Sequence, residues 1–297
     1  MTKEDKVLVT KASGEVVPFS AQKLKRSLER VGAGGEESDK IISEVSTHLV
    51  DGITTKEIYR IAFNLLKKNS GHLAAKYHLK NAIMELGPSG FPFEKYISEI
   101  LSHQGYKTNV GVVVQGQCVT HEIDIIAEQE SNYFMIECKY HNQRGIFCDV
   151  KIPLYIQARF KDVESQWIKL PDHKNKFHQG WVVTNTRFSK DAIQYGNCAG
   201  LHLLGWNYPE KNGLRELIDR SGLYPITCLT TLSQTEKQFL LQRKIVLCKE
   251  LIANENDLLE AQINPSRIKS IKEDVKRLCQ SLNGKKITIL KHRQNDE

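Results

Sequence analysis

Two short, largely apolar runs near the middle of the chain constrain its fold most strongly, because charged residues interrupt both at fixed positions. Residues 122–127 and 133–140 are bounded by polar residues and separated by a short polar segment, which predicts two strands joined by a hairpin loop. Side chains alternate between the two faces of a strand, so Glu137 and Lys139 are expected on one face. Asp124, on the neighbouring strand, is expected to lie opposite them.

This cluster has the chemistry of a metal-assisted hydrolytic site. Mg²⁺ or Mn²⁺ takes hard oxygen ligands and keeps several waters, so one or two carboxylates hold it beside a phosphate. The metal lowers the pKa of a bound water and stabilises charge on phosphoryl oxygens. Lys139 is placed to orient or deprotonate that water, or to neutralise developing charge. The alternative is a set of cross-strand charge pairs on a solvated sheet face.

Flanking segments extend the pattern. A helical run at residues 93–105 begins with Phe-Glu and ends in a Gly typical of a C-cap. A buried-looking strand opens at Trp181, ends at Asn185 and leads into a helix. This order of helix, Gly-Tyr, Ile-Asp-Ile-Ile, Ile-Glu-Cys-Lys and Val-Thr-Asn resembles the restriction-endonuclease-like superfamily, the PD-(D/E)xK fold, over about residues 91–222. The similarity is to its Mrr-type catalytic domains and its archaeal Holliday-junction resolvases.

That resemblance implies a metal-dependent nuclease with assigned residues. Asp124 and Glu137 would bind the metal, with the carbonyl of Cys138 as a third ligand. Lys139 would be the catalytic lysine, and Glu94 falls where many members carry an additional acidic residue on the first helix. The Pro that usually precedes the Asp is absent, as it often is in this superfamily.

Other polar residues near these strands are candidate contacts. Lys151 and Arg159 lie just past the second strand and are expected, with Asn185, to contact nucleic acid; helix-surface charge is the alternative for the two cations. His173 and His178 lie in a polar segment, which favours a solvated loop over a metal site.

The N-terminal segment predicts a hairpin followed by helices. Residues 7–19 read as two short strands around a Ser-Gly turn. Apolar residues then recur at helical spacing. The expected helices begin after Ser20, near residue 41, at Thr54 or Thr55, and at residue 74, the last ending at Gly87.

This arrangement, with Val-Thr-Lys-x-x-Gly at its front, resembles the ATP-cone over roughly residues 5–90, a module that senses ATP and dATP. The resemblance implies that Lys11, Lys23 and Lys80 contact nucleotide phosphates. Val9 would sit near the base, and Thr55 would offer a hydroxyl near the phosphates. The cofactor-binding positions carried over are Val9, Lys11, Gly14, Ser20, Lys23, Thr55 and Lys80. For each lysine taken singly, the alternative is a solvated surface charge. Ala12 stands where an ATP-cone usually has a basic residue after Lys11.

Composition agrees with an intracellular nucleic-acid enzyme. The 297 residues carry a formal charge of +7, which suits a nucleic-acid partner. Seven dispersed cysteines without a Cys-x-x-Cys read as reduced thiols of a cytoplasmic protein. The N-terminus does not resemble a signal peptide, and no apolar run approaches a membrane span.

From about residue 223 the sequence predicts a small helical module with helical runs at 236–253 and 263–282 and a frayed tail. It weakly resembles a helix-hairpin-helix unit that would grip a DNA backbone. A packing or dimerisation appendage is the equal alternative.

Together these features predict an α/β multidomain protein. An N-terminal helical ATP-cone with a small β-hairpin (1–90) precedes an α/β restriction-endonuclease-like core with a mixed sheet (91–222) and the helical module (223–297). The expected function is a Mg²⁺- or Mn²⁺-dependent DNA endonuclease regulated by ATP or dATP, in a homo-oligomer by analogy with other cones. The alternative is a nucleotide-responsive DNA-binding regulator whose nuclease fold is inactive.

Overall fold

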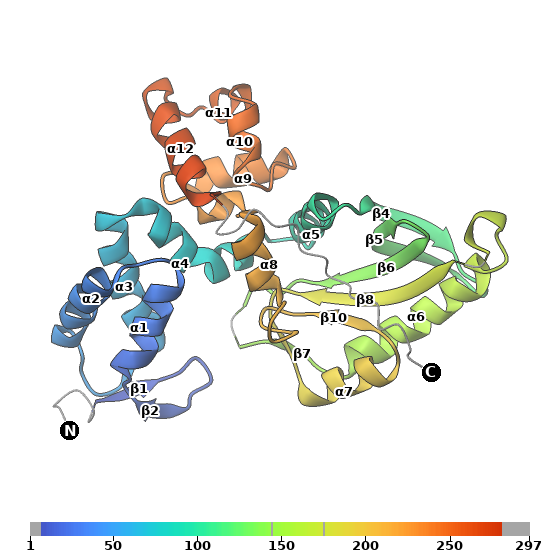
Figure 1. Cartoon of the computed structure of the whole chain (residues 1–297), viewed down its shortest axis with the longest axis horizontal. Coiled ribbons are helices and arrows are strands. Elements are labelled where there is room, and N and C mark those ends of the chain that lie inside the picture. Colours follow the sequence, from blue (N-terminus) through green and yellow to red (C-terminus); the bar gives the residue numbers. More distant parts are fainter. Residues whose placement is uncertain (1–6, 144, 175, 281–297) are drawn as a thin grey trace. The chain divides into compact units, whose positions relative to one another are not determined.

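The computed structural model describes residues 7–280 except 144 and 175 (Figure 1). The described residues form two compact units, one of residues 7–83 and 224–280 and the other of residues 84–223. The C-terminal helices are thus grouped with the N-terminal segment. The mixed α/β architecture confirms the expected fold class, whereas the bounds of the three expected domains stay predictions.

The first unit begins with a small sheet of strand order β2–β1–β3. The predicted hairpin is present as β1 (Leu8–Thr10) and β2 (Val16–Pro18), which pair antiparallel. Gly14 in the turn has φ +82°, a left-handed conformation that glycine adopts without a Cβ clash. The third strand, β3 (Ile53–Thr54), pairs parallel with β1 and was not predicted.

Helices follow the sheet in the order that the sequence predicts. Ser20 caps the first helix, accepting a hydrogen bond from the backbone N–H of Lys23. Thr54, rather than Thr55, caps the third and forms a capping box with Glu57. The four helices are α1 (Ala21–Arg30), α2 (Gly35–Thr47), α3 (Thr55–Asn69) and α4 (Gly71–Met84). Their apolar faces meet in one core that also includes Val9 and Ile53 of the sheet.

The C-terminal module is helical, as predicted, but its first helix is broken. The run expected at residues 236–253 is divided because Lys244 adopts a left-handed φ of +63°, which an α-helix does not tolerate. The end of the run expected at 263–282 and the tail beyond it lie outside the described residues. The module comprises η3 (Ile226–Cys228), α9 (Gln234–Gln242), α10 (Glu250–Ala253), α11 (Asn256–Glu260) and α12 (Pro265–Leu278).

Buried polar contacts join this module to α4. The Thr227 hydroxyl donates to the carbonyl of Ala82 at 2.7 Å, and the buried Lys237 ammonium donates to the carbonyl of Thr227 at 2.8 Å. The Lys76 ammonium lies 5.9 Å from the centroid of the Tyr224 ring. These contacts support the packing alternative for the module; a DNA-gripping role stays a prediction.

The second unit is built on a five-stranded sheet of order β10–β8–β6–β5–β4. Strands β4, β5 and β6 are antiparallel neighbours, whereas β6, β8 and β10 are parallel, so the sheet is mixed as expected. The strands are β4 (Lys107–Gln115), β5 (Thr120–Gln129), β6 (Asn132–Lys139), β8 (Phe177–Thr184) and β10 (His202–Leu204). A separate parallel pair consists of β7 (Phe147–Cys148) and β9 (Arg187–Phe188).

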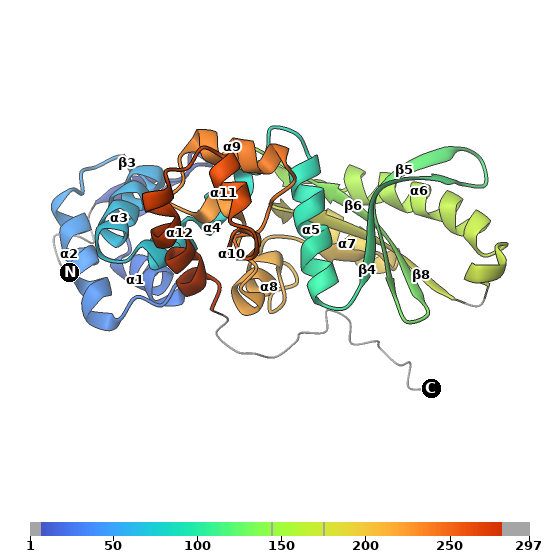
Figure 2. The same ribbon diagram turned by 90° about the horizontal axis from the view of Figure 1, so that it is seen from above.

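Helices lie on both sides of this sheet (Figures 1 and 2). α5 (Phe91–His103) packs against β4 and β5, whereas α6 (Lys151–Trp167) packs against β8 and α7 (Lys190–Cys198) against β10. The remaining elements are η2 (Pro171–His173) and α8 (Leu214–Ser221). Among the described residues, no helix is long and apolar enough to cross a membrane.

Candidate active site and nucleotide-binding region

The predicted acidic cluster lies where two strands separate. The register of β5 and β6 ends at the pair Ile125 and Ile136. Beyond it, the backbone N–H of Cys138 donates instead to the Asp124 carboxylate, with N to Oδ2 at 2.7 Å. β6 remains paired with β8 as far as Lys139. Asp124 therefore bridges the opening between the strands.

Glu137 is the buried centre of the cluster, with 6% of its surface exposed. Its Oε1 accepts a hydrogen bond from Lys139 Nζ at 3.1 Å, which confirms that the two side chains share a face. Its Oε2 accepts one from Arg159 Nη1 on α6 at 2.6 Å. Arg159 also donates to the carbonyl of Glu122. Two cations thus hold both carboxylate oxygens on the sheet face that α6 covers.

Glu94, in the first turn of α5, joins this cluster electrostatically. Burial, together with the charges of Asp124 and Glu137, raises the pKa of Glu94 to about 7. Burial and the charge of Glu137 likewise raise the pKa of Asp124 to about 6. The Cys138 N–H, Lys139 and Arg159 oppose that shift. Carboxylates crowded in this way repel one another, so the site favours either protonation of a carboxylate or binding of a cation.

The end of β6 is braced by β8 and the residues after it. The Thr184 hydroxyl donates to the Lys139 carbonyl at 2.7 Å. Asn185 is 1% exposed; its Oδ1 accepts from the N–H of His141 at 2.9 Å, and its Nδ2 donates to the carbonyl of His141 at 2.7 Å. Both ends of the Asn185 amide are therefore used internally. Its expected role as a nucleic-acid contact is wrong for this structure, because a buried, fully paired amide cannot meet a ligand.

The two basic residues expected to contact nucleic acid differ in position. Lys151 begins α6 and is exposed. Arg159 is half-buried and bound to Glu137, so it is a partner of the acidic cluster rather than a surface cation. The sequence carried a signal for this: Ile156 and Phe160, at helical spacing around Arg159, are buried against the sheet.

The donor set fits a hard divalent cation. The Asp124 and Glu137 carboxylates and the neighbouring Cys138 carbonyl are all oxygen donors, which Mg²⁺ and Mn²⁺ prefer. The Cys138 thiol does not compete, since burial raises its pKa well above the ordinary value. Within the described ranges, no group of three or more His, Cys, Asp or Glu side chains is arranged to hold a metal. The solvated loop expected for His173 and His178 is wrong for His178, which is buried on β8, and the two rings stack on each other.

In the first unit, several expected nucleotide-contact residues have structural partners. Val9 is buried in the core. The Ser20 hydroxyl caps α1, and Gly14 makes the hairpin turn. Lys11 Nζ forms an ion pair with Glu15 Oε2 at 2.9 Å on the exposed hairpin. Thr55 is exposed at the first position of α3.

Contacts at Tyr77 join three helices, α1, α3 and α4, which carry the remaining expected nucleotide ligands, Lys23, Thr55 and Lys80. Tyr77 of α4 is hydrogen-bonded to Ser27 of α1, and its ring stacks on Tyr59 of α3 with centroids 5.2 Å apart. Burial raises the pKa of Tyr77. α1 follows β2 and α3 follows β3 of the small sheet, and α4 follows α3 after the single linking residue Ser70.

Three expected nucleotide ligands lie about one helical turn from these contacts. Lys23 is four residues before Ser27, Thr55 is four before Tyr59, and Lys80 is three after Tyr77. All three are exposed. Their convergence on a nucleotide stays a prediction.

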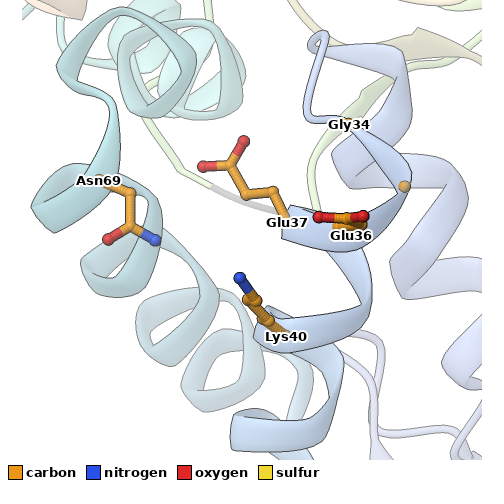
Figure 3. Close-up of a pocket in the computed structure, with 6 residues that line it drawn as sticks. Gly34, Glu36, Glu37, Lys40 and Asn69 are labelled. Carbon is orange, nitrogen blue, oxygen red and sulfur yellow. The ribbon is translucent and has the colours of Figure 1, made fainter.

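A pocket of about 450 Å³ lies elsewhere in this unit (Figure 3). It is lined by Gly34, Gly35, Glu36, Glu37, Lys40 and Asn69. Asn69 ends α3, roughly 20 Å from Thr55 at the helix start by the rise per residue. Glu36 and Glu37 outnumber the single lysine, so the pocket does not suit a triphosphate.

Comparison with known proteins identifies each segment. Three protein-family models match this chain: an ATP cone domain at residues 7–80, a restriction endonuclease domain at 87–206, and the C-terminal domain of AF1548-like proteins at 224–279. The first two confirm the resemblances that the sequence motifs carry. These domains support a nuclease with a nucleotide-binding regulatory module.

Two relatives extend the comparison. An uncharacterized protein of Archaeoglobus fulgidus is 36% identical over 183 residues, covering 61% of this chain and 99% of that protein. The crystal structure of AF1548, a protein of unknown function, shares 34% identity with a TM-score of 0.53 and covers 64% of this chain and 98% of that one. The chain therefore belongs to the family of AF1548-like proteins and joins an ATP-cone to a restriction-endonuclease domain.

Proposed function

We propose that this protein is a metal-dependent DNA endonuclease whose activity responds to ATP or dATP bound by its cone. The observation that carries the proposal is the convergence of Asp124, Glu137 and Lys139 at the opening between β5 and β6, with Glu94 in electrostatic contact. Folding alone does not favour this crowding, because buried carboxylates repel one another and lose hydration. A site that keeps buried, crowded carboxylates at this cost in free energy is a candidate functional site.

Each residue has a distinct part in the proposed reaction. Asp124, Glu137 and the carbonyl of Cys138 would hold Mg²⁺ or Mn²⁺, which supplies an acidified water and stabilises phosphoryl charge. The Lys139 ammonium, one-third exposed, would donate to the attacking water or to a phosphate oxygen. Glu94 has a pKa of about 7, so at neutral pH it exists in both protonation states and can accept a proton.

The cone would act on this site through linkage. Lys23 and Lys80, with Thr55 beside them and Lys11 on the hairpin, are proposed to bind the triphosphate. Nucleotide shifts an equilibrium only by its differential affinity for the two states. We propose a change in homo-oligomeric state as that equilibrium, by analogy with other cones.

Plasmid cleavage tests the nuclease assignment. With Mg²⁺ or Mn²⁺ the wild type should cut DNA, whereas Asp124→Asn, Glu137→Gln and Lys139→Ala should each lose several powers of ten in rate without additivity. Ca²⁺ should support binding but little cutting. Glu128→Gln is a matched control, since Glu128 lies on β5 away from the opening and accepts a hydrogen bond from Tyr133. Full cleavage by Glu137→Gln in Mg²⁺ would remove the assignment.

One observation favours a second candidate, a nucleotide-responsive DNA-binding regulator without nuclease activity. Both carboxylate oxygens of Glu137 are already held by Lys139 and Arg159, which is a stable arrangement without a metal. This regulator would bind DNA in Mg²⁺, change its affinity with ATP or dATP, and leave every phosphodiester intact. The same plasmid assay, combined with a binding assay, separates the two functions.

A further inference from the structure

Exposed aromatic rings lie on the segment that follows the active-site strand. Phe147 of β7 is 46% exposed, and Tyr155 in the second turn of α6 is 59% exposed. Ile146 and Leu154 beside them are exposed as well. Exposed large apolar side chains such as these are candidates for a binding surface.

Cations accompany both rings. The guanidinium of Arg187 lies 5.8 Å from the centroid of Phe147, its register partner in the β7–β9 pair. The guanidinium of Arg159 lies 5.5 Å from the centroid of Tyr155. Lys151 is exposed one turn before Tyr155 on α6. Proteins that bind single-stranded nucleic acid combine such rings, on which bases stack, with cations that follow the backbone.

Both rings connect to the proposed active site through short chains of contacts. The guanidinium beside Tyr155 is the one that binds Glu137. Cys148, next to Phe147, is hydrogen-bonded to Thr184, whose hydroxyl donates to the Lys139 carbonyl. The aromatic segment therefore adjoins both of the predicted catalytic residues on β6.

These observations point to a substrate class. We propose that Phe147 and Tyr155 stack on unpaired bases of DNA beside the phosphate that is cut, so that the protein prefers DNA with single-stranded nucleotides at that point. The proposal rests on the nuclease function proposed above. In a continuous duplex the faces of the bases are covered by their neighbours, whereas unpaired bases offer open faces. The cations suit a polyanion, although Asp149, which accepts the Lys151 backbone N–H, and Glu137, which binds Arg159, reduce the local charge.

Fluorescence anisotropy with the full chain in Ca²⁺ measures this preference without cleavage. The probes are a single-stranded oligonucleotide, a blunt duplex and a fully paired four-way junction. The wild type should bind the single strand most tightly. Phe147→Leu, which keeps an apolar side chain without a ring, and Tyr155→Ala should each weaken single-strand binding by roughly 5- to 150-fold, the range expected for loss of one stacked base. Duplex binding should change much less.

Matched variants identify the cause of any loss. Phe147→Trp keeps a ring and should retain binding. Phe177→Ala removes an equally exposed ring, 47%, at the start of β8, roughly 20 Å along the sheet from the active-site end, and should bind like the wild type. A 2-aminopurine base in the single strand should be quenched on binding to the wild type and less quenched by Phe147→Leu.

Defined outcomes overturn the proposal. Equal wild-type affinity for single strand and blunt duplex would do so, as would equal losses on both probes. Conversion of an oligomer to a monomer by Phe147→Leu would instead assign this surface to contacts between copies of the chain. A wild type that prefers single strands but cuts no DNA in Mg²⁺ would refute the nuclease function while leaving the base-stacking surface in place.

Discussion

The hydroxyl of Tyr140 donates a hydrogen bond to the carbonyl of Met84 at 2.5 Å. Tyr140 directly follows Lys139 in the chain, and Met84 is the last residue of α4, which carries Lys80. The Tyr140 ring also packs on Phe93, the neighbour of Glu94, with centroids 5.6 Å apart. Met84 is thus bonded to the neighbour of Lys139, within the unit that carries the proposed active site.

Tyr140→Phe should weaken the response of cleavage to nucleotide while basal cleavage in Mg²⁺ persists. The variant keeps the ring against Phe93 and removes only the bond to Met84. Rates with and without ATP or dATP give the response, and Tyr133→Phe, which removes a hydroxyl bond from β6 to Glu128 of β5, is the control. An unchanged nucleotide response in Tyr140→Phe would exclude this contact from the coupling.

Arg159→Ala should destabilise the metal-free protein and make its stability unusually sensitive to divalent cations. Arg159 and Glu137 form a largely buried ion pair, and removing one partner of such a pair costs about 3–5 kcal/mol. A divalent cation bound at Glu137 would replace the lost positive charge. Thermal melting with EDTA and with Ca²⁺ should therefore differ more in this variant than in the wild type.

The control for Arg159 is Lys161→Ala, which removes an exposed partner of Glu164 on the same helix. It should have a small effect, because exposed ion pairs contribute little. An Arg159→Ala variant that melts like the wild type in EDTA would show that this ion pair does not stabilise the fold.

The stability that Glu94 and Asp124 contribute to the metal-free protein should fall as pH rises from about 4 to about 7. Glu94 and Asp124 have ordinary pKa values of 4.5 and 3.8, which the fold raises to about 7 and about 6. The folded state then binds protons that the unfolded state has released, so the stability they contribute is present at low pH and lost through this range. Burial lowers the pKa of His202 to about 4, which acts in the opposite direction, so the test compares Glu94→Gln with the wild type. In urea unfolding, the stability of Glu94→Gln relative to the wild type should rise across this pH range, and identical profiles would contradict the raised pKa of Glu94.

The sequence predicted the acidic cluster because the cluster is local. Glu137 and Lys139 are two residues apart on a strand, and Asp124 lies across a short hairpin, so alternation alone brings them together. Arg159 escaped this reasoning because its contact with Glu137 depends on how α6 crosses the sheet. The apolar residues around Arg159 indicate that it lies beside the buried face of α6, but they do not indicate which carboxylate that face meets.

Features that depend on contacts between distant parts of the chain were likewise not predicted from the sequence. β3 is two residues long, and only its pairing with β1 makes it a strand. The break at Lys244 comes from a left-handed backbone conformation. Neither Gly nor Asn, the residues that usually adopt this conformation, stands at this position. The joining of the C-terminal module to α4 rests on Thr227, a residue with no distinguishing pattern around it.

Lys237→Met should lower the free energy of unfolding by about 1–3 kcal/mol, because it removes the donor to the buried Thr227 carbonyl. Lys269→Met, an exposed change on α12, should alter it by at most about 0.5 kcal/mol. Equilibrium urea unfolding measures both. Equal stability of the two variants would indicate that the Lys237 contact contributes nothing to the packing of the C-terminal module.

Lys23→Ala should abolish binding of ATP and dATP without lowering the stability of the nucleotide-free protein. Lys23 is exposed, so folding gains little from its charge. Bound nucleotide stabilises the folded state by mass action, by about 2.7 kcal/mol at one hundred times Kd. The wild type should therefore melt at a higher temperature with nucleotide, and Lys23→Ala should not.

Lys25→Ala provides the matched control on the same helix. Lys25 lies two residues after Lys23 and forms an ion pair with Asp39 at 2.5 Å. It therefore takes no part in the proposed phosphate contacts. This variant should keep its nucleotide-dependent shift and lose at most a little stability. Calorimetry with ATP and dATP gives the affinities directly. Absence of any binding to the wild type at millimolar nucleotide would mean that the cone has kept its fold without its ligand, and the regulation proposed for the nuclease would fail with it.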